Sequence, residues 1–265
     1  MTHPTRNIIL VVGSSASGKT FGLEYTRVAL KTLGIRYENI PISDAQTILE
    51  RIREDDERGG RNHYHDWNRG QLGHSHSHHS GITPFTLAGR EIGIAFMRDF
   101  FGALANVPSD GKIWRAEWSG GVNKNSKNDP ASLTDVSFAT ISGLLHDGTI
   151  RSDGLDHVLA ILHMQASREH RMHLNNSRSG APDPELVRLG RASWKLDATA
   201  MRIFGEDDFD AAIPVLREHG IPIIRTIHNE GRDELYQKLD AVLPEILSFW
   251  RGGETGQGGL KRKEH

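Results

Sequence analysis

The sequence predicts an α/β protein built on a parallel sheet. Short apolar runs rich in β-branched residues alternate with segments of helical periodicity along most of the chain, which is typical of βαβ units. A glycine-rich loop joins the first apolar run to the first helical segment. A chain of 265 residues is long enough to bury a large core of its own, and we expect residues 1–251 to form a single domain.

Five apolar segments are expected to form the strands of this sheet. The first, Asn7 to Val12, is followed by Gly13 and has the composition of a strand buried on both faces. The expected strands cover residues 7–12, 35–43, 112–118, 157–163 and 221–227. Helical spacing of apolar residues predicts one helix that ends near Leu33. It predicts three further helices over residues 44–58, 87–105 and 233–250. Residues 252–265 are rich in glycine and charge, which predicts a disordered tail.

The composition excludes several classes of site. The chain has 32 Lys and Arg against 34 Asp and Glu, a formal net charge of −2, so no overall basic field attracts nucleic acid or anionic lipid. The absence of cysteine excludes disulfides, zinc–thiolate sites, iron–sulfur clusters and thiol nucleophiles. The apolar run Ile8 to Val12 is far shorter than the roughly 18 residues that span a bilayer. We therefore expect a cytoplasmic protein with no membrane partner.

The glycine-rich loop carries the strongest functional signal. It matches the pattern G-x-x-x-x-G-K-[ST], directly after an expected strand and at the start of an expected helix. In that context, backbone N–H groups curl around phosphate oxygens, and the helix N-terminus adds the positive end of its dipole. Its lysine, expected to be exposed, neutralises the β and γ phosphates, and the threonine hydroxyl is offered to Mg²⁺. The residues expected to bind ATP are Gly13, Ser14, Ser15, Ala16, Ser17, Gly18, Lys19 and Thr20.

With this loop, the chain resembles the P-loop kinases, the nucleoside and nucleotide kinase-like branch of the P-loop NTPases. The resemblance implies a three-layer sandwich in which a five-stranded parallel sheet has helices on both faces. It also implies a substrate-binding region after the second strand, an arginine-bearing helical lid at residues 165–180, and ATP with Mg²⁺ as cofactors. The segments that follow this plan, under half of the chain, are 7–20, 42–44, 115–118, 163–178 and 226–229.

Two acidic residues are candidates for the catalytic base. Glu117 lies next to the end of the strand expected over 112–118, and Asp44 follows the strand expected over 35–43. An acid at the carboxyl end of a strand beside the loop can hold Mg²⁺ through water or accept the proton of an attacking hydroxyl. The resemblance assigns catalysis to both residues, with Thr20 and Glu117 as the metal-binding pair, and leaves open which acid is the base. Asp44 is also suited to cap a helix.

Arginines and an asparagine follow the fourth and fifth expected strands. Arg168 and Arg171 lie three residues apart, on one face of a helix, where the resemblance implies contact with the transferring phosphate. We expect Arg178 to contact the acceptor substrate. The family often has an adenine-contacting loop at the position of Asn229. For the two arginines, the alternative is a solvated surface helix without a ligand. For Asn229, the alternative is a residue that only ends the strand.

A histidine-rich segment, residues 59–84, is expected to be a long loop on the substrate side. Its histidines could hold a transition metal, contact the substrate or do neither. Its position after the second strand favours the substrate, and His63, His65 and Asp66 are the residues expected to touch it.

The predicted activity is ATP- and Mg²⁺-dependent transfer of the γ-phosphoryl group to a small-molecule acceptor, with a nucleoside or nucleotide favoured. One alternative is a kinase acting on a base or an end within DNA or RNA, which the net charge disfavours but a local arginine groove would allow. Another is a regulatory P-loop GTPase or ATPase. Against the GTPase, residues 123–126 read Asn-Lys-Asn-Ser and lack the aspartate of the guanine-reading motif N-K-x-D.

Overall fold

The structure is a computed structural model that describes residues 6–14, 16–42, 89–121, 137–177 and 206–255. Several expected site residues lie outside these ranges. They are Ser15, Asp44, His63, His65, Asp66 and Arg178.

Five parallel strands form one sheet in the order β2-β3-β1-β4-β5. Their bounds are Ile8–Gly13 for β1, Tyr37–Asn39 for β2, Ile113–Ser119 for β3, Val158–Gln165 for β4 and Ile223–His228 for β5. All five expected strands are therefore present. The second is shorter than expected because pairing ends after Ile40, whose N–H donates to the carbonyl of Arg115, and Pro41 has no N–H to continue the ladder.

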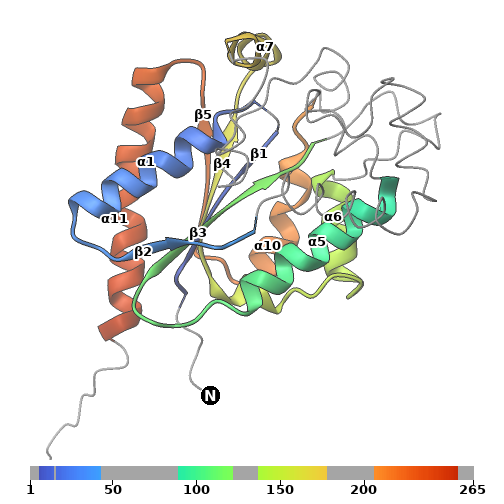
Figure 1. Cartoon of the computed structure of the whole chain (residues 1–265), viewed down its shortest axis with the longest axis horizontal. Helices are drawn as coiled ribbons and strands as arrows, with labels where there is room; N and C mark the ends of the chain where they lie inside the picture. Colours follow the sequence, from blue (N-terminus) through green and yellow to red (C-terminus); the bar gives the residue numbers. More distant parts are fainter. Residues whose placement is uncertain (1–5, 15, 43–88, 122–136, 178–205, 256–265) are drawn as a thin grey trace, which may run out of the picture.

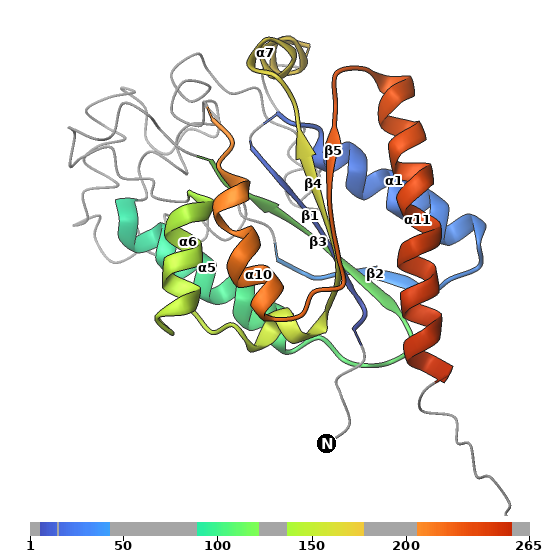
Figure 2. The ribbon, with the colours of Figure 1, turned by 180° about the vertical axis from the view of Figure 1, so that it is seen from behind.

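Helices cover both faces of the sheet (Figures 1 and 2). Helices α1 (Lys19–Thr32) and α11 (Arg232–Thr255) lie on one face. On the other face lie α5 (Gly89–Ala105), α6 (Phe138–His146) and α10 (Ile213–Glu218). Helix α7 (Arg168–Asn176) lies beyond the carboxyl end of β4. This arrangement confirms the expected three-layer sandwich, although α11 ends at Thr255 and not near residue 250.

Two hydrophobic cores, one on each face, hold the layers together. Along β1, side chains alternate between them: Ile8, Leu10 and Val12 pack with α5, α6 and α10, whereas Ile9 and Val11 pack with α1 and α11. All five are fully buried, as expected for the central strand of a parallel sheet covered on both faces. The strand that leads into the glycine-rich loop is thus fixed from both sides. Within the described ranges, no helix is long and apolar enough to cross a membrane.

Candidate functional site

The glycine-rich loop turns sharply between β1 and α1, and two of its glycines are required by the geometry. Gly13 has a φ of 149°, and a Cβ on it would lie 2.4 Å from the carbonyl oxygen of Met164 on β4. Gly18 has a φ of 98°, and a Cβ there would lie 2.4 Å from Nδ2 of Asn229. Only glycine fits these backbone conformations without displacing a neighbour. The loop is therefore held close to the ends of β4 and β5.

Lys19, Thr20 and Glu117 lie together at the start of α1. The strands β1 and β3 pair with Val11 opposite Glu117, which places this carboxylate at the side of the loop. The Thr20 hydroxyl donates to Oε2 of Glu117 at 3.2 Å, and Lys19 Nζ lies 4.0 Å from Oε1. Lys19 also donates to the carbonyl of Ser14 at 2.7 Å. Contrary to the expectation of an exposed side chain, Lys19 is 5% exposed.

The chemistry of these residues fits a nucleotide with Mg²⁺. The threonine hydroxyl and the glutamate carboxylate are the hard oxygen ligands that Mg²⁺ prefers, either directly or through water. Ser17 Oγ is buried and makes no hydrogen bond to any described part of the chain. A buried hydroxyl without a hydrogen-bond partner among the described residues, in the loop that leads into Lys19, is suited to meet a polar ligand. The expected metal pair, Thr20 and Glu117, is therefore brought together by the fold.

Asn229 follows β5, as the sequence suggested, and its side chain contacts the glycine-rich loop. Its Nδ2 donates to the carbonyl of Ser17 at 2.9 Å, and its backbone N–H donates to the carbonyl of Gln165 at 2.7 Å. The residue is 5% exposed. These contacts support a role in holding the loop between the ends of β4 and β5.

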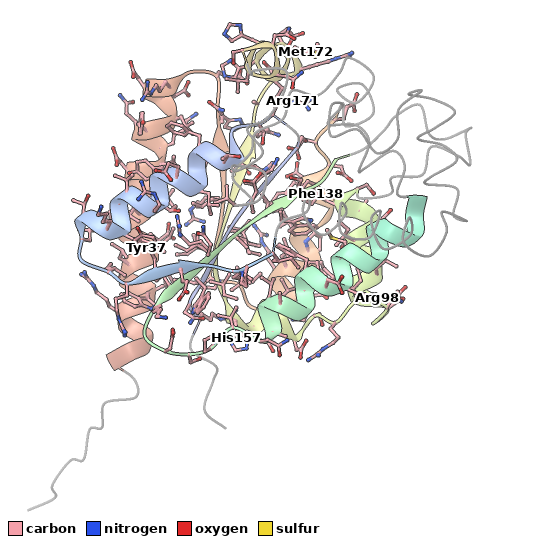
Figure 3. All side chains as sticks on the ribbon, in the orientation of Figure 1. Tyr37, Arg98, Phe138, His157, Arg171 and Met172 are labelled. Carbon is pink, nitrogen blue, oxygen red and sulfur yellow. The ribbon has the colours of Figure 1, made fainter. Side chains whose placement is uncertain are left out.

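The two arginines of α7 lie in different environments. Ser167 caps this helix by accepting the N–H of His170 at 3.2 Å. Arg168 is exposed, whereas Arg171 is 3% exposed on the side of α7 that faces the strand ends (Figure 3). Burial lowers the pKa of Arg171, an effect that the negative charge of Asp207 opposes. The structure therefore offers Arg168 to solvent and holds Arg171 beneath the helix.

A second acid, Asp207, lies behind the glycine-rich loop. Its Oδ2 accepts the hydroxyl of Ser14 at 3.2 Å and is 2.9 Å from Nε2 of His163 on β4. The His163 ring is 1% exposed, stacks on Phe209 with ring centroids 4.2 Å apart, and lies 3.2 Å by Nδ1 from the Thr226 hydroxyl. Burial alone would raise the pKa of Asp207, but the hydrogen bond and charge of His163, together with the other donors, lower this pKa below its ordinary value. Asp207 thus faces the loop as a carboxylate.

Asp207 and His163 were not among the site residues expected from the sequence. A lone histidine inside the apolar run of β4 was a usable signal, because a buried imidazole needs hydrogen-bond partners. Asp207 belongs to the short acidic run Glu206 to Asp208. Its neighbour Asp208 has a different role, since its carboxylate accepts the N–H groups of Phe138 and Ala139 at the start of α6.

The chain thus has a three-layer α/β fold with the glycine-rich loop after the central strand of its sheet, as expected from the resemblance to the P-loop NTPases. No protein-family model matches the chain, and no curated protein matches it. Similar solved structures include shikimate kinase from Acinetobacter baumannii in complex with shikimate, at 12% identity and a TM-score of 0.35, over 92% of this chain and 94% of that chain. A second is TT1252 from Thermus thermophilus, at 16% identity and a TM-score of 0.37, over 92% and 98%.

A third similar structure is deoxyadenosine kinase from M. mycoides with bound dATP, at 8% identity and a TM-score of 0.38, over 91% of this chain and 99% of that chain. Two of the three are named as kinases. At these TM-scores the likeness transfers no substrate to the present chain.

Proposed function

We propose that the protein is an ATP- and Mg²⁺-dependent kinase that transfers the γ-phosphoryl group to a small-molecule acceptor, with a nucleoside or nucleotide favoured. The observation that carries this proposal is the arrangement of Lys19, Thr20 and Glu117 at the end of a glycine cradle, with 3.2 Å between the hydroxyl and the carboxylate. A cation, a hydroxyl and an acid at a helix N-terminus are the groups that phosphoryl transfer requires.

Each residue has a distinct role in the proposal. The backbone N–H groups of Gly13 to Thr20 bind the phosphates, and Lys19 exchanges its bond to the Ser14 carbonyl for phosphate oxygens. Thr20 and Glu117 would hold Mg²⁺, which supplies charge neutralisation at the β and γ phosphates when bound. Arg168 and Arg171 stabilise the charge that spreads over the transferring group.

The residues that contact the acceptor are proposed from the sequence. Asp44 or Glu117 accepts the proton of the attacking hydroxyl, and His63, His65, Asp66 and Arg178 contact the acceptor. Of these residues only Glu117 lies within the described ranges. Its bond to Thr20 favours the metal-binding role for Glu117, which leaves Asp44 as the proposed base.

One labelling experiment tests the proposal. The purified protein is incubated with γ-labelled ATP, Mg²⁺ and separate pools of nucleosides, nucleotides, sugars and oligonucleotides, and the labelled product is identified. Label on a nucleoside or nucleotide supports the proposal, and label on an oligonucleotide supports the kinase of DNA or RNA. Release of inorganic phosphate from ATP or GTP without a labelled acceptor would favour a regulatory NTPase and would contradict the proposal.

A further inference from the structure

We infer that Glu230 is a positioning residue that fixes the start of the arginine-bearing helix α7 to the loop between β5 and α11. Its effect on catalysis rests on the function proposed above, whereas the contacts themselves do not. Glu230 is exposed and directly follows Asn229. It thus belongs to the loop that contacts the glycine-rich loop.

Both carboxylate oxygens of Glu230 bind the residue that caps α7. Oε1 accepts the backbone N–H of Ser167 at 2.6 Å, and Oε2 accepts the Ser167 hydroxyl at 2.9 Å. The same hydroxyl accepts the N–H of His170 in the first turn of the helix. One continuous chain of hydrogen bonds therefore leads from the carboxylate into α7.

This contact completes a capping box from outside the helix. In a capping box, a Glu or Gln three residues after the N-cap returns a bond to the N–H of the capping residue. In α7 that position is His170, which has no carboxylate or amide oxygen. Glu230, 63 residues further along the chain, supplies the missing bond. Its negative charge also lies at the positive end of the helix dipole. The N-terminal cap of α7 therefore has all of its hydrogen bonds only while the β5–α11 loop holds Glu230 against Ser167.

The neighbouring residue connects the same loop to the nucleotide side. Asn229 donates to the carbonyl of Ser17 in the glycine-rich loop and to the carbonyl of Gln165 at the end of β4. Two successive residues therefore join the phosphate-binding loop, the end of β4 and the start of α7. Arg168 is the first residue of that helix, so its distance from Lys19 depends on both contacts. The geometry makes the glycine-rich loop and the arginine helix one unit.

The contact is tested first without any acceptor, by hydrogen exchange on the intact protein. In Glu230→Ala, the amides of residues 170–176 should exchange about 10-fold faster than in the wild type, the change equivalent to the loss of one hydrogen bond to a charged group. Glu234→Gln is the matched control, because this exposed carboxylate lies on the same stretch of chain and pairs with Lys238 within α11. Equal exchange of α7 in wild type and Glu230→Ala would overturn the inference and leave the proposed function intact.

The catalytic consequence is tested by kinetics with the acceptor that the labelling experiment identifies. Glu230→Ala should lower kcat about 10-fold and change the KM for ATP less than about twofold, since the arginines act on the transferring group and the glycine-rich loop binds ATP. Ser167→Thr, which keeps the hydroxyl, should retain wild-type kcat. In a Ser167→Ala background the effect of Glu230→Ala on kcat should be smaller than in the wild type, because the shared contact is already partly lost.

The possible outcomes separate the two proposals. A lower melting temperature with unchanged kcat, measured well below that temperature, would make Glu230 merely structural and overturn the positioning role. Failure of the wild type to bind a non-hydrolysable ATP analogue with Mg²⁺ in a calorimetric titration would contradict the proposed function and, with it, the catalytic role of the contact. The exchange result would then still decide whether Glu230 fixes α7.

Discussion

The substitution Gly18→Ala tests whether the glycine-rich loop depends on its contact with Asn229. A Cβ at this position would lie 2.4 Å from Nδ2 of Asn229. Because that atom ends a flexible side chain, the clash is relieved by rotation of the amide. The rotation breaks the 2.9 Å hydrogen bond from Asn229 to the buried carbonyl of Ser17. We therefore expect the glycine-rich loop to change its conformation and the free energy of unfolding to fall.

The magnitude follows from two contributions. An alanine in left-handed backbone costs about 1 kcal/mol, and the unsatisfied carbonyl of Ser17 costs about 1–3 kcal/mol. Gly18→Ala should thus lower the free energy of unfolding by about 3 kcal/mol. Gly34→Ala is the matched control, since Gly34 has a φ of 67° and a Cβ there meets nothing within 4 Å. It should cost only the backbone contribution, about 1 kcal/mol.

Urea unfolding and calorimetric titration with ADP measure the two effects. Gly18→Ala should bind ADP about 10-fold more weakly or worse, equivalent to about 1.4 kcal/mol, while Gly34→Ala should bind it as the wild type does. Equal stability losses in the two variants, together with unchanged ADP affinity in Gly18→Ala, would refute the reasoning.

Three further predictions concern the charged groups of the site. Lys19→Met, which keeps the buried aliphatic stem, should abolish phosphoryl transfer while the far-ultraviolet circular dichroism spectrum stays that of the wild type. Because Glu117 would hold Mg²⁺ at the transferring phosphate, Glu117→Gln should lower kcat at least about 10²-fold with little change in ADP affinity, and an unchanged kcat would remove Glu117 from the reaction. The pKa of Asp207 is lowered in the folded state, so the stabilisation from its charge is fully present above the ordinary carboxyl pKa. This stabilisation is lost as the pH falls from the ordinary pKa through the lowered pKa of the folded state. Urea unfolding between pH 6 and pH 3 should therefore show a smaller loss of stability in Asp207→Asn than in the wild type, and parallel curves would contradict this role.

Local patterns in the sequence were sufficient to predict the sheet and the glycine-rich loop. The β-branched run of β1, the glycines that follow it and the helical spacing of α1 are all properties of consecutive residues. The end of β3 located Glu117, because parallel strands that neighbour each other bring their carboxyl ends to the same edge of the sheet. The structure confirms that Glu117 meets Thr20 there. Helix ends were less certain, and α11 continues to Thr255.

The sequence alone did not determine which distant polar groups meet around the loop. Ser14 and Asp207 are 193 residues apart, and Ser167 and Glu230 are 63 apart. No local periodicity encodes such pairs, since a single acidic or hydroxyl side chain has the same pattern at the surface as at a site. Only the crossover connections of the sheet, which bring the ends of β1, β4 and β5 together, select these partners. The sequence thus determined the position of the glycine-rich loop between β1 and α1, and the tertiary structure decided which side chains hold that loop and helix α7 in place.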